Sequence, residues 1–485
     1  MKNTFLFVAI ILFVCTSAFA YDWSVNLGDG SSENPFQIST PDHLMSIGSD
    51  VNLLDKSYIL ICDIVFDPNN NPEHVFTAGL IAPYISSQGI PGFSGHFDGK
   101  GFKVVNLKIN NGERSVGLFG SIMGTSYEDV LVENVTLVNP LVSGASASGS
   151  LVGLAENCKI RNCHVTGGLV SEPDGIGNGG LLGGISYSIA EECTSSADVI
   201  GDYCLGGLAG STNYSCLVRC SASGSVTGRM AVGGLLGHAF PWFDLDMVDR
   251  VEIVNCFATG DVHAEHVYGG GLIGRVLTGS VRNCYASGSV TGGSILGGLI
   301  GTVEFLRPPG GNSGSFTEIV ISECYSTGDV DGQVEFIGGF IGKNLEIVKD
   351  CYASGSVKGN SSVGGLIGID QGTITFCFST GQVEGIENTG GLIGSNGSSS
   401  YGMNHLCFWD VEASGIGASG DDNFGAIGKT TAEMKSWSTF TDADWDFNEV
   451  WIIGMGHYPM LSPRIAGDIN SDGIVNLKRS IFACQ

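Results

Sequence analysis

A run of oxygen-bearing residues near the end of the chain has the spacing of a calcium-binding loop. An EF-hand-like loop ligates calcium through oxygens at positions 1, 3, 5, 7 and 9 and turns at a glycine in position 6. The glycine is Gly473, and the ligand positions are occupied by Asp468, Asn470, Asp472, Ile474 (through its backbone carbonyl) and Asn476. Position 12, which normally supplies a bidentate acid, is Arg479. We therefore expect weak Ca²⁺ binding at most, because a positive charge replaces two ligand oxygens.

Three aspartates at equivalent positions of a repeat are candidates for acid–base chemistry. They are Asp198, Asp261 and Asp329, but serines intervene, with Ser225 after the first and Ser289 after the second. Hydrolysis of a glycosidic bond needs two carboxyl groups about 5 to 9 Å apart. Because the spacing does not place two of these aspartates on consecutive repeats, no catalytic residue is assigned.

A column of aromatic residues is the better candidate for a binding surface. In six successive repeats an aromatic residue directly follows a cysteine, namely Phe257, Tyr285, Tyr325, Tyr352, Phe378 and Phe408. Neighbouring residues of a strand point to opposite faces, so a buried cysteine column predicts an outward aromatic column. Two interpretations stay open. The rings stack on one another and stabilise the sheet, or they form a strip that binds a glycan or another protein.

The element that positions these residues is a repeat of about 27 residues. Its most constant phrase is Gly-Gly-Leu-Ile-Gly, with looser forms at Val116–Gly120 and Gly149–Gly153. The clear copies begin at Gly179, Gly206, Gly233, Gly270, Gly297, Gly338, Gly364 and Gly390. A fixed period of this length predicts a stacked repeat fold, whose function lies on a long surface.

The repeat has the texture of short β-strands. The many glycines, Gly 75 in all, disfavour helices. Runs such as Thr373-Ile-Thr-Phe-Cys-Phe378 and Ser280-Val-Arg-Asn-Cys-Tyr285 are rich in β-branched and aromatic residues and are bounded by glycines. We therefore predict an all-β fold, a parallel β-helix with three short strands and three corners per coil, and favour the right-handed sense. Longer spacings after Gly233 and Gly297 predict loops inserted at one place in the coil.

Cysteines mark a second column. Nine of them share one repeat position: Cys163, Cys193, Cys220, Cys256, Cys284, Cys324, Cys351, Cys377 and Cys407. Stacked coils would superimpose them as buried free thiols, because in-register side chains point in parallel rather than toward one another. Outside this column, Cys204 and Cys216 are candidates for a disulfide.

The N-terminal residues and the net charge indicate where the protein is located and which partners are excluded. Lys2, the apolar stretch from Phe5 to Val14 and the Ala18-Phe-Ala20 pattern predict a secretory signal at residues 1–20. The formal net charge is −27, and loss of Lys2 would make it −28 (21 basic minus 49 acidic residues). This charge argues against nucleic acid and anionic membranes as partners. No other stretch is long and apolar enough to span a membrane.

The predicted organisation has five parts. After the signal, residues 21–110 form an N-terminal cap with the first irregular coils, including a strand at 34–38 and a short helix at 41–47. Residues 111–411 form the β-helix, 412–465 a C-terminal cap, and 466–485 the calcium loop. Thr430 and Glu433 have capping-box spacing for a short helix. The tryptophans at 437, 445 and 451 are expected to close the end of the solenoid.

The repeat phrase resembles that of the secreted bacterial GLUG-repeat proteins. The likeness extends from Asn34–Ile38 and Phe97–Gly99 to Phe408–Asp410 and Gly428–Met434. It implies a surface or extracellular protein. Some members cleave immunoglobulin A, with the motif outside their catalytic unit. That activity is not implied here, because the chain has no His-Glu-x-x-His, and its nearest pair, His263 and His266, is expected in a surface turn.

The calcium loop itself resembles the first repeat of a dockerin, the module that binds cohesin-bearing scaffolds. The second dockerin repeat is absent, so a truncated or frame-shifted end is as good an explanation as a working site. Cohesin would be a partner only if the native tail is complete. The expected function is that of a secreted or cell-surface interaction protein, adhesin-like and non-catalytic, whose partner is an extracellular glycan or protein. The alternative is a polysaccharide lyase or glycoside hydrolase on a β-helix.

Overall fold

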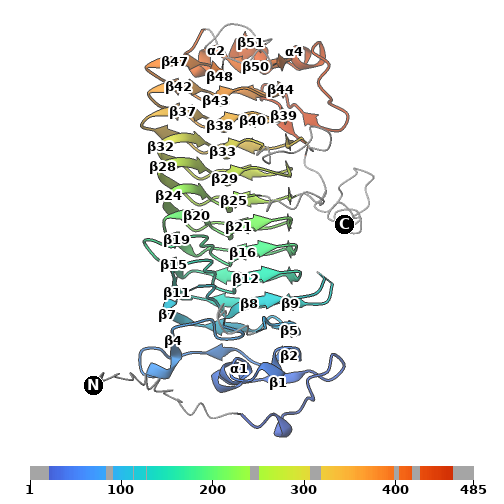
Figure 1. The fold of residues 1–485 in the computed structure, drawn as a ribbon. Helices are drawn as coiled ribbons and strands as arrows, with labels where there is room; N and C mark the ends of the chain where they lie inside the picture. Colours follow the sequence, from blue (N-terminus) through green and yellow to red (C-terminus); the bar gives the residue numbers. More distant parts are fainter. Residues whose placement is uncertain are drawn as a thin grey trace, which may run out of the picture.

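The chain folds into a parallel β-solenoid, as the repeat predicts. The computed structural model describes residues 21–83, 91–112, 114–126, 128–240, 251–305, 318–397, 403–417 and 426–462. Their strands stack into four long parallel sheets of 13, 13, 15 and 10 strands, here called A, B, C and D. The coils follow one another in chain order from the blue N-terminal cap to the red C-terminal cap (Figure 1).

One coil illustrates the unit. β12 (Val152–Glu156) lies in sheet D, β13 (Lys159–Arg161) in sheet A, β14 (His164–Thr166) in sheet B and β15 (Leu169–Ser171) in sheet C. Each pairs in parallel with the equivalent strand of the next coil. The coil therefore contributes to four sheets, and the predicted count of three strands is wrong.

A corner that was not predicted explains why each coil has four strands rather than three. The run predicted as one strand at 373–378 is divided into β44 (Thr373–Thr375) and β45 (Phe378–Ser379). Between them Phe376 has a left-handed φ of 53°, and Asn283 has the same φ at the equivalent position. One left-handed residue turns the chain from sheet A to sheet B, and asparagine adopts this conformation more readily than most residues. The corner residues of this column are Asn134, Asn162, Glu192, Arg219, Asn255, Asn283, Glu323, Asp350, Phe376 and Leu406.

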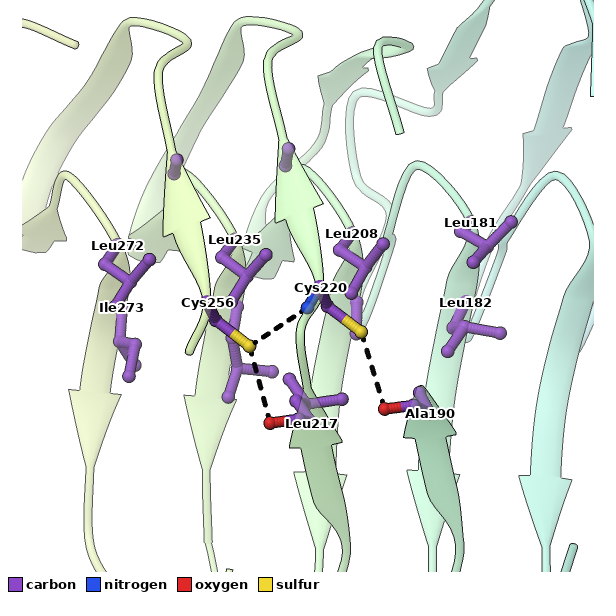
Figure 2. Packing of buried hydrophobic residues seen from close by; sticks show 14 of the residues in the cluster. Leu181, Leu182, Ala190, Leu208, Leu217, Cys220, Leu235, Cys256, Leu272 and Ile273 are labelled. Carbon is purple, nitrogen blue, oxygen red and sulfur yellow. Dashed lines mark hydrogen bonds between the residues drawn. The ribbon is translucent and has the colours of Figure 1, made fainter. Parts of the chain in front are cut away.

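The cysteine column lies directly after these corners, inside the solenoid. All nine cysteines are at most 1% exposed, and the eight from Cys163 to Cys377 are free thiols. Adjacent coils are linked through them, since the Cys220 backbone N–H donates to Cys256 Sγ at 3.3 Å and Cys256 Sγ–H donates to the Leu217 carbonyl at 3.4 Å (Figure 2). The predicted buried thiol column is confirmed. Cys204 is also a free thiol, so the suggested bridge to Cys216 is wrong.

The burial of the column predicts its reactivity. Burial raises the pKa of the Cys256 thiol well above its ordinary value, and the thiolate is the reactive form. We expect a thiol reagent to label the column cysteines of the native protein slowly and those of the denatured protein at once. Mass spectrometry of labelled peptides measures both. Rapid native labelling of most column positions would contradict the burial seen here.

The Gly-Gly-Leu-Ile-Gly phrase forms the corner that enters sheet D. Its leucine is fully buried in successive coils, as at Leu235, Leu272 and Leu299. A Cβ on Gly270 would lie 2.0 Å from the Ile273 carbonyl oxygen, and one on Gly271 would lie 2.1 Å from that of Gly298 on the next coil. The glycines recur because stacked backbones approach too closely for any side chain.

The N-terminal cap matches its predicted elements. β1 (Phe36–Ile38) pairs with β2 (Ser57–Leu60) at the start of sheet A. The helix α1 (Pro41–Ile47) begins after Thr40, whose Oγ1 accepts a hydrogen bond from the His43 N–H. Its buried Leu44 and Ile47 join the core that fills the solenoid. None of the helices in the described ranges is long and apolar enough to cross a bilayer.

The C-terminal cap (residues 426–462) differs from the expectation in one respect. The predicted capping box is confirmed, with Thr430 and Glu433 at the start of α3 (Thr431–Met434). However, Trp437 is 60% exposed, and Trp445 and Trp451 pack beside the last coils. The interior of the final coil is filled instead by Trp409 of β50 (Cys407–Asp410), whose Nε1–H donates to the Ile416 carbonyl. Trp409 replaces the alanine or serine that occupies this inward position in the coils from Ser195 to Ser379.

Candidate binding surface

The six predicted aromatic residues form one column on the outside of sheet B, here called the aromatic ladder. Phe257, Tyr285, Tyr325, Tyr352, Phe378 and Phe408 pair in register from β27 (Phe257–Ala258) to β50. Successive rings from Phe257 to Phe378 stack with centroids 4.9 to 5.0 Å apart and planes within 2° to 8°. Stacked pairs of this kind contribute about 0.5–1.5 kcal/mol each beyond burial. The ladder therefore stabilises sheet B whatever else it does.

The stacking determines which atoms of the aromatic ladder are exposed. Each ring covers the face of its neighbour, so the outer surface consists of ring edges and tyrosine hydroxyls rather than open ring faces. Burial raises the pKa values of Tyr285, Tyr325 and Tyr352, so these phenols stay protonated at neutral pH. The positive edge of an aromatic ring favours contact with the face of another aromatic group.

The chain covers part of this ladder itself. Phe378 and Phe408 are 1% and 3% exposed because Phe440, Trp445 and Trp451 of the C-terminal cap pack over them. The four remaining rings, Phe257, Tyr285, Tyr325 and Tyr352, are only partly buried, although Trp451 of the cap also contacts Tyr352. The accessible strip is therefore shorter than the six positions predicted.

Polar residues border the strip on both sides. On one side stand the left-handed corner residues Asn255, Asn283, Glu323 and Asp350. On the other side stand the exposed hydroxyl residues Thr259, Ser287, Thr327 and Ser354. An apolar strip between rows of hydrogen-bonding groups can recognise a partner that combines a flat apolar group with donors.

The three aspartates considered as candidates for catalysis form hydrogen bonds between neighbouring coils. Asp198 Oδ1 accepts hydrogen bonds from the Ser225 N–H (2.8 Å) and hydroxyl (2.7 Å), and Asp329 does the same for Ser356. Asp261 accepts from the Ser289 N–H at 2.9 Å. Aspartate and serine thus alternate along the column, and each carboxylate binds the coil that follows it.

Other predicted residues lie elsewhere or outside the described ranges. His263 and His266 belong to β28 (Val262–Gly270), so the expected surface turn is wrong; His263 Nδ1 lies 2.9 Å from Thr291 Oγ1. The calcium-loop residues Asp468, Asn470, Asp472, Ile474 and Asn476 fall outside the described residues. Within those residues, no three histidine, cysteine or acidic side chains are grouped to hold a metal ion.

A buried polar column was not predicted. Inward positions at this level of sheet D are apolar in the earlier coils, as at Ile185 and Val303, with Thr212 as an exception, but carry Asn344, Asp370 and Asn396 in the last coils. Asp370 is 1% exposed; its Oδ1 accepts from Asn344 Nδ2 at 2.8 Å, whereas its Oδ2 is buried without a partner. Burial raises the pKa of Asp370 to about 6. The signal in the sequence was a polar residue three places after the phrase's Ile, and recognising it required knowing which strand residues point inward.

The comparisons with known proteins agree with the repeat. The GLUG motif matches residues 144–170 and 266–291, each of which includes one glycine phrase and one cysteine position. Halomucin from Haloquadratum walsbyi is 34% identical over 181 residues, which are 37% of this chain and 2% of halomucin. The chain thus matches about 2% of the length of that relative.

A solved structure also aligns along most of the chain. It is the crystal structure of a candidate immunoglobulin A1 protease from Bacteroides ovatus, with 15% identity and coverage of 90% of this chain and 94% of that one. The TM-score is 0.27, too low to establish a shared fold. The strand pairing described above, together with the two motif matches, identifies the chain as a parallel β-solenoid that carries the GLUG motif.

Proposed function

We propose that this chain is a secreted or cell-surface interaction protein that binds an extracellular glycan or protein through the accessible part of the aromatic ladder. The observation that carries the proposal is the strip of four partly exposed rings bordered by amide, carboxylate and hydroxyl groups. A contiguous apolar strip on a polar surface is typical of a contact site. The signal-like residues 1–20 support an extracellular location, and the net charge of −27 argues against nucleic acid as the partner.

Two rungs of the ladder can be replaced by residue types that sheet B already carries at this position. Ser221 pairs with Phe257 in sheet B, and Thr194 precedes it, so earlier coils already carry small hydroxyl residues at the ladder position. The combined substitution Tyr285→Ser and Tyr325→Ser therefore introduces residues that this sheet accepts. His263→Thr is the matched control, because His263 lies on sheet C between Thr227 and Thr291 in the same register.

The test is binding to a glycan array and to a panel of purified extracellular proteins. We expect a partner whose affinity falls at least about tenfold with the double ladder variant, which corresponds to ~1.4 kcal/mol, and stays unchanged with His263→Thr. Circular dichroism and thermal unfolding confirm that both variants fold. If every partner found binds the ladder variant as well as the parent, the binding surface lies elsewhere.

A further inference from the structure

We propose that Phe257, Tyr285 and Tyr325, called the uncovered rungs because no residue of the described C-terminal cap packs over them, bind a tryptophan-bearing polypeptide segment in the way this cap binds the last rungs. The inference rests on the proposed function and names the class of partner. Its basis is a contact that the chain makes with itself, on a surface that repeats from coil to coil.

The cap makes the same kind of contact twice. Trp451 places its ring centroid 6.3 Å from that of Tyr352 and 5.8 Å from that of Phe378, at tilts of 48° and 52°, and its Nε1–H donates to Asp350 Oδ1 at 3.2 Å. Trp445 lies 5.8 Å from Phe408, and its Nε1–H donates to the Leu406 carbonyl at 3.0 Å. In both cases an indole ring meets ladder rings while its N–H reaches the left-handed corner residue of the same coil.

The corner residue and the ring keep a fixed relation because both belong to the repeat, although the acceptor is the side-chain carboxylate at Asp350 and the main-chain carbonyl at Leu406. Asp350 and Leu406 have φ values of 54° and 56°, and Asn283 and Asn255 occupy the same corner with 53° and 55°. Each stands two residues before its ladder ring, as Asn283 does before Tyr285. In-register pairing of the coils therefore repeats the docking geometry along the uncovered rungs.

The coils of Phe257 and Tyr285 retain their acceptors. Among the described residues, no group donates to the backbone carbonyl or to the side-chain oxygen of Asn283 or Asn255. An indole N–H that approaches Asn283 would meet an oxygen of the corner residue. Asp350 provides such an acceptor for Trp451, and Leu406 provides one for Trp445. Buried indole N–H groups require such a partner, and tryptophan is frequent at the centres of protein interfaces.

The ring geometry favours this partner over a sugar. A sugar stacks its C–H face on an open aromatic face, but the facing rings of this stack cover one another at 4.9 to 5.0 Å, and the side of Phe257 toward Ser221 is the exception. Ring edges remain, and the face of an indole suits them. The tilts of Trp451 against Tyr352 and Phe378, 48° and 52°, are intermediate between stacked and edge-on.

A synthetic peptide with the sequence of residues 436–453 tests the inference on the full-length chain. This peptide contains all three tryptophans of the cap, and a fluorescein label reports binding by anisotropy. We expect saturable binding to the parent and to His263→Thr, and at least about tenfold weaker binding to the Tyr285→Ser, Tyr325→Ser variant. A peptide with Trp445→Ala and Trp451→Ala should not bind.

The outcomes separate this inference from the proposed function. Absence of saturable binding up to millimolar peptide overturns the inference, and so does equal binding to the ladder variant, which would mean that the peptide displaces the chain's own cap. If a glycan loses affinity for the ladder variant while the peptide fails to bind, the proposed function stands and the tryptophan partner is wrong.

Discussion

Substitution of Gly271 by alanine is expected to destabilise the middle of the solenoid by about 3 kcal/mol or more, since overpacking a close-packed site costs about 1–3 kcal/mol even where side chains can yield. Here the new Cβ would lie 2.1 Å from the Gly298 carbonyl oxygen and 2.9 Å from Ala286 Cβ. The oxygen belongs to the backbone of the next coil, so relief requires the two coils to separate. That separation would weaken the parallel pairing of β28 with β32 (Val290–Gly297).

Thermal unfolding and limited proteolysis measure the effect. In a solenoid each coil contacts chiefly its neighbours, so the damage should appear first as cleavage near residues 265–300. Gly417→Ala is the matched control, because a Cβ there meets no atom within 4 Å and its φ is not left-handed. An unchanged melting temperature for Gly271→Ala would contradict the stacking described for the glycine corners.

The repeat could be predicted from the sequence because the residues that produce it recur at a fixed period. A glycine that cannot carry a Cβ and a leucine that fills the core return in most coils, so the phrase at Gly270–Gly274 predicts its own stacking. The corner between sheets A and B is harder to predict from the sequence. Its left-handed φ is borne by Asn283 in one coil but by Phe376 in another, and a phenylalanine there is typical of a strand.

The candidate surface was predicted in position but not in extent. A column of rings follows from one aromatic residue per repeat, and its stacking follows from the register. The cover over Phe378 and Phe408 does not follow from the repeat, because it depends on Trp445 and Trp451, which fold back from beyond the repeat. Tertiary contacts of this kind have no periodic signature, and the three tryptophans were accordingly assigned to the wrong place.

Replacement of Asp370 by asparagine is expected to stabilise the protein at pH 8 by about 3 kcal/mol. The pKa of this carboxyl rises from 3.8 to about 6 because burial disfavours its charged form, and each pKa unit corresponds to ~1.36 kcal/mol. The asparagine side chain has nearly the same shape and keeps an oxygen for Asn344 Nδ2. It also adds a donor on the coil next to Asn396, whose buried Oδ1 lacks one.

The sign of the pH dependence follows from the raised pKa. The folded state binds the Asp370 proton more tightly than the unfolded state, so the penalty of the buried charge is absent below about pH 3.8, grows as pH rises, and is complete above about pH 6. Asp350, whose pKa burial also raises, contributes in the same direction. The difference in unfolding free energy between Asp370→Asn and the parent isolates Asp370, since Asp350 is common to both. We expect that difference, measured by urea unfolding of the C-terminal coils, to be largest at pH 8 and to shrink toward pH 4. A difference independent of pH would mean that the pKa of Asp370 is the same in the folded and the unfolded protein.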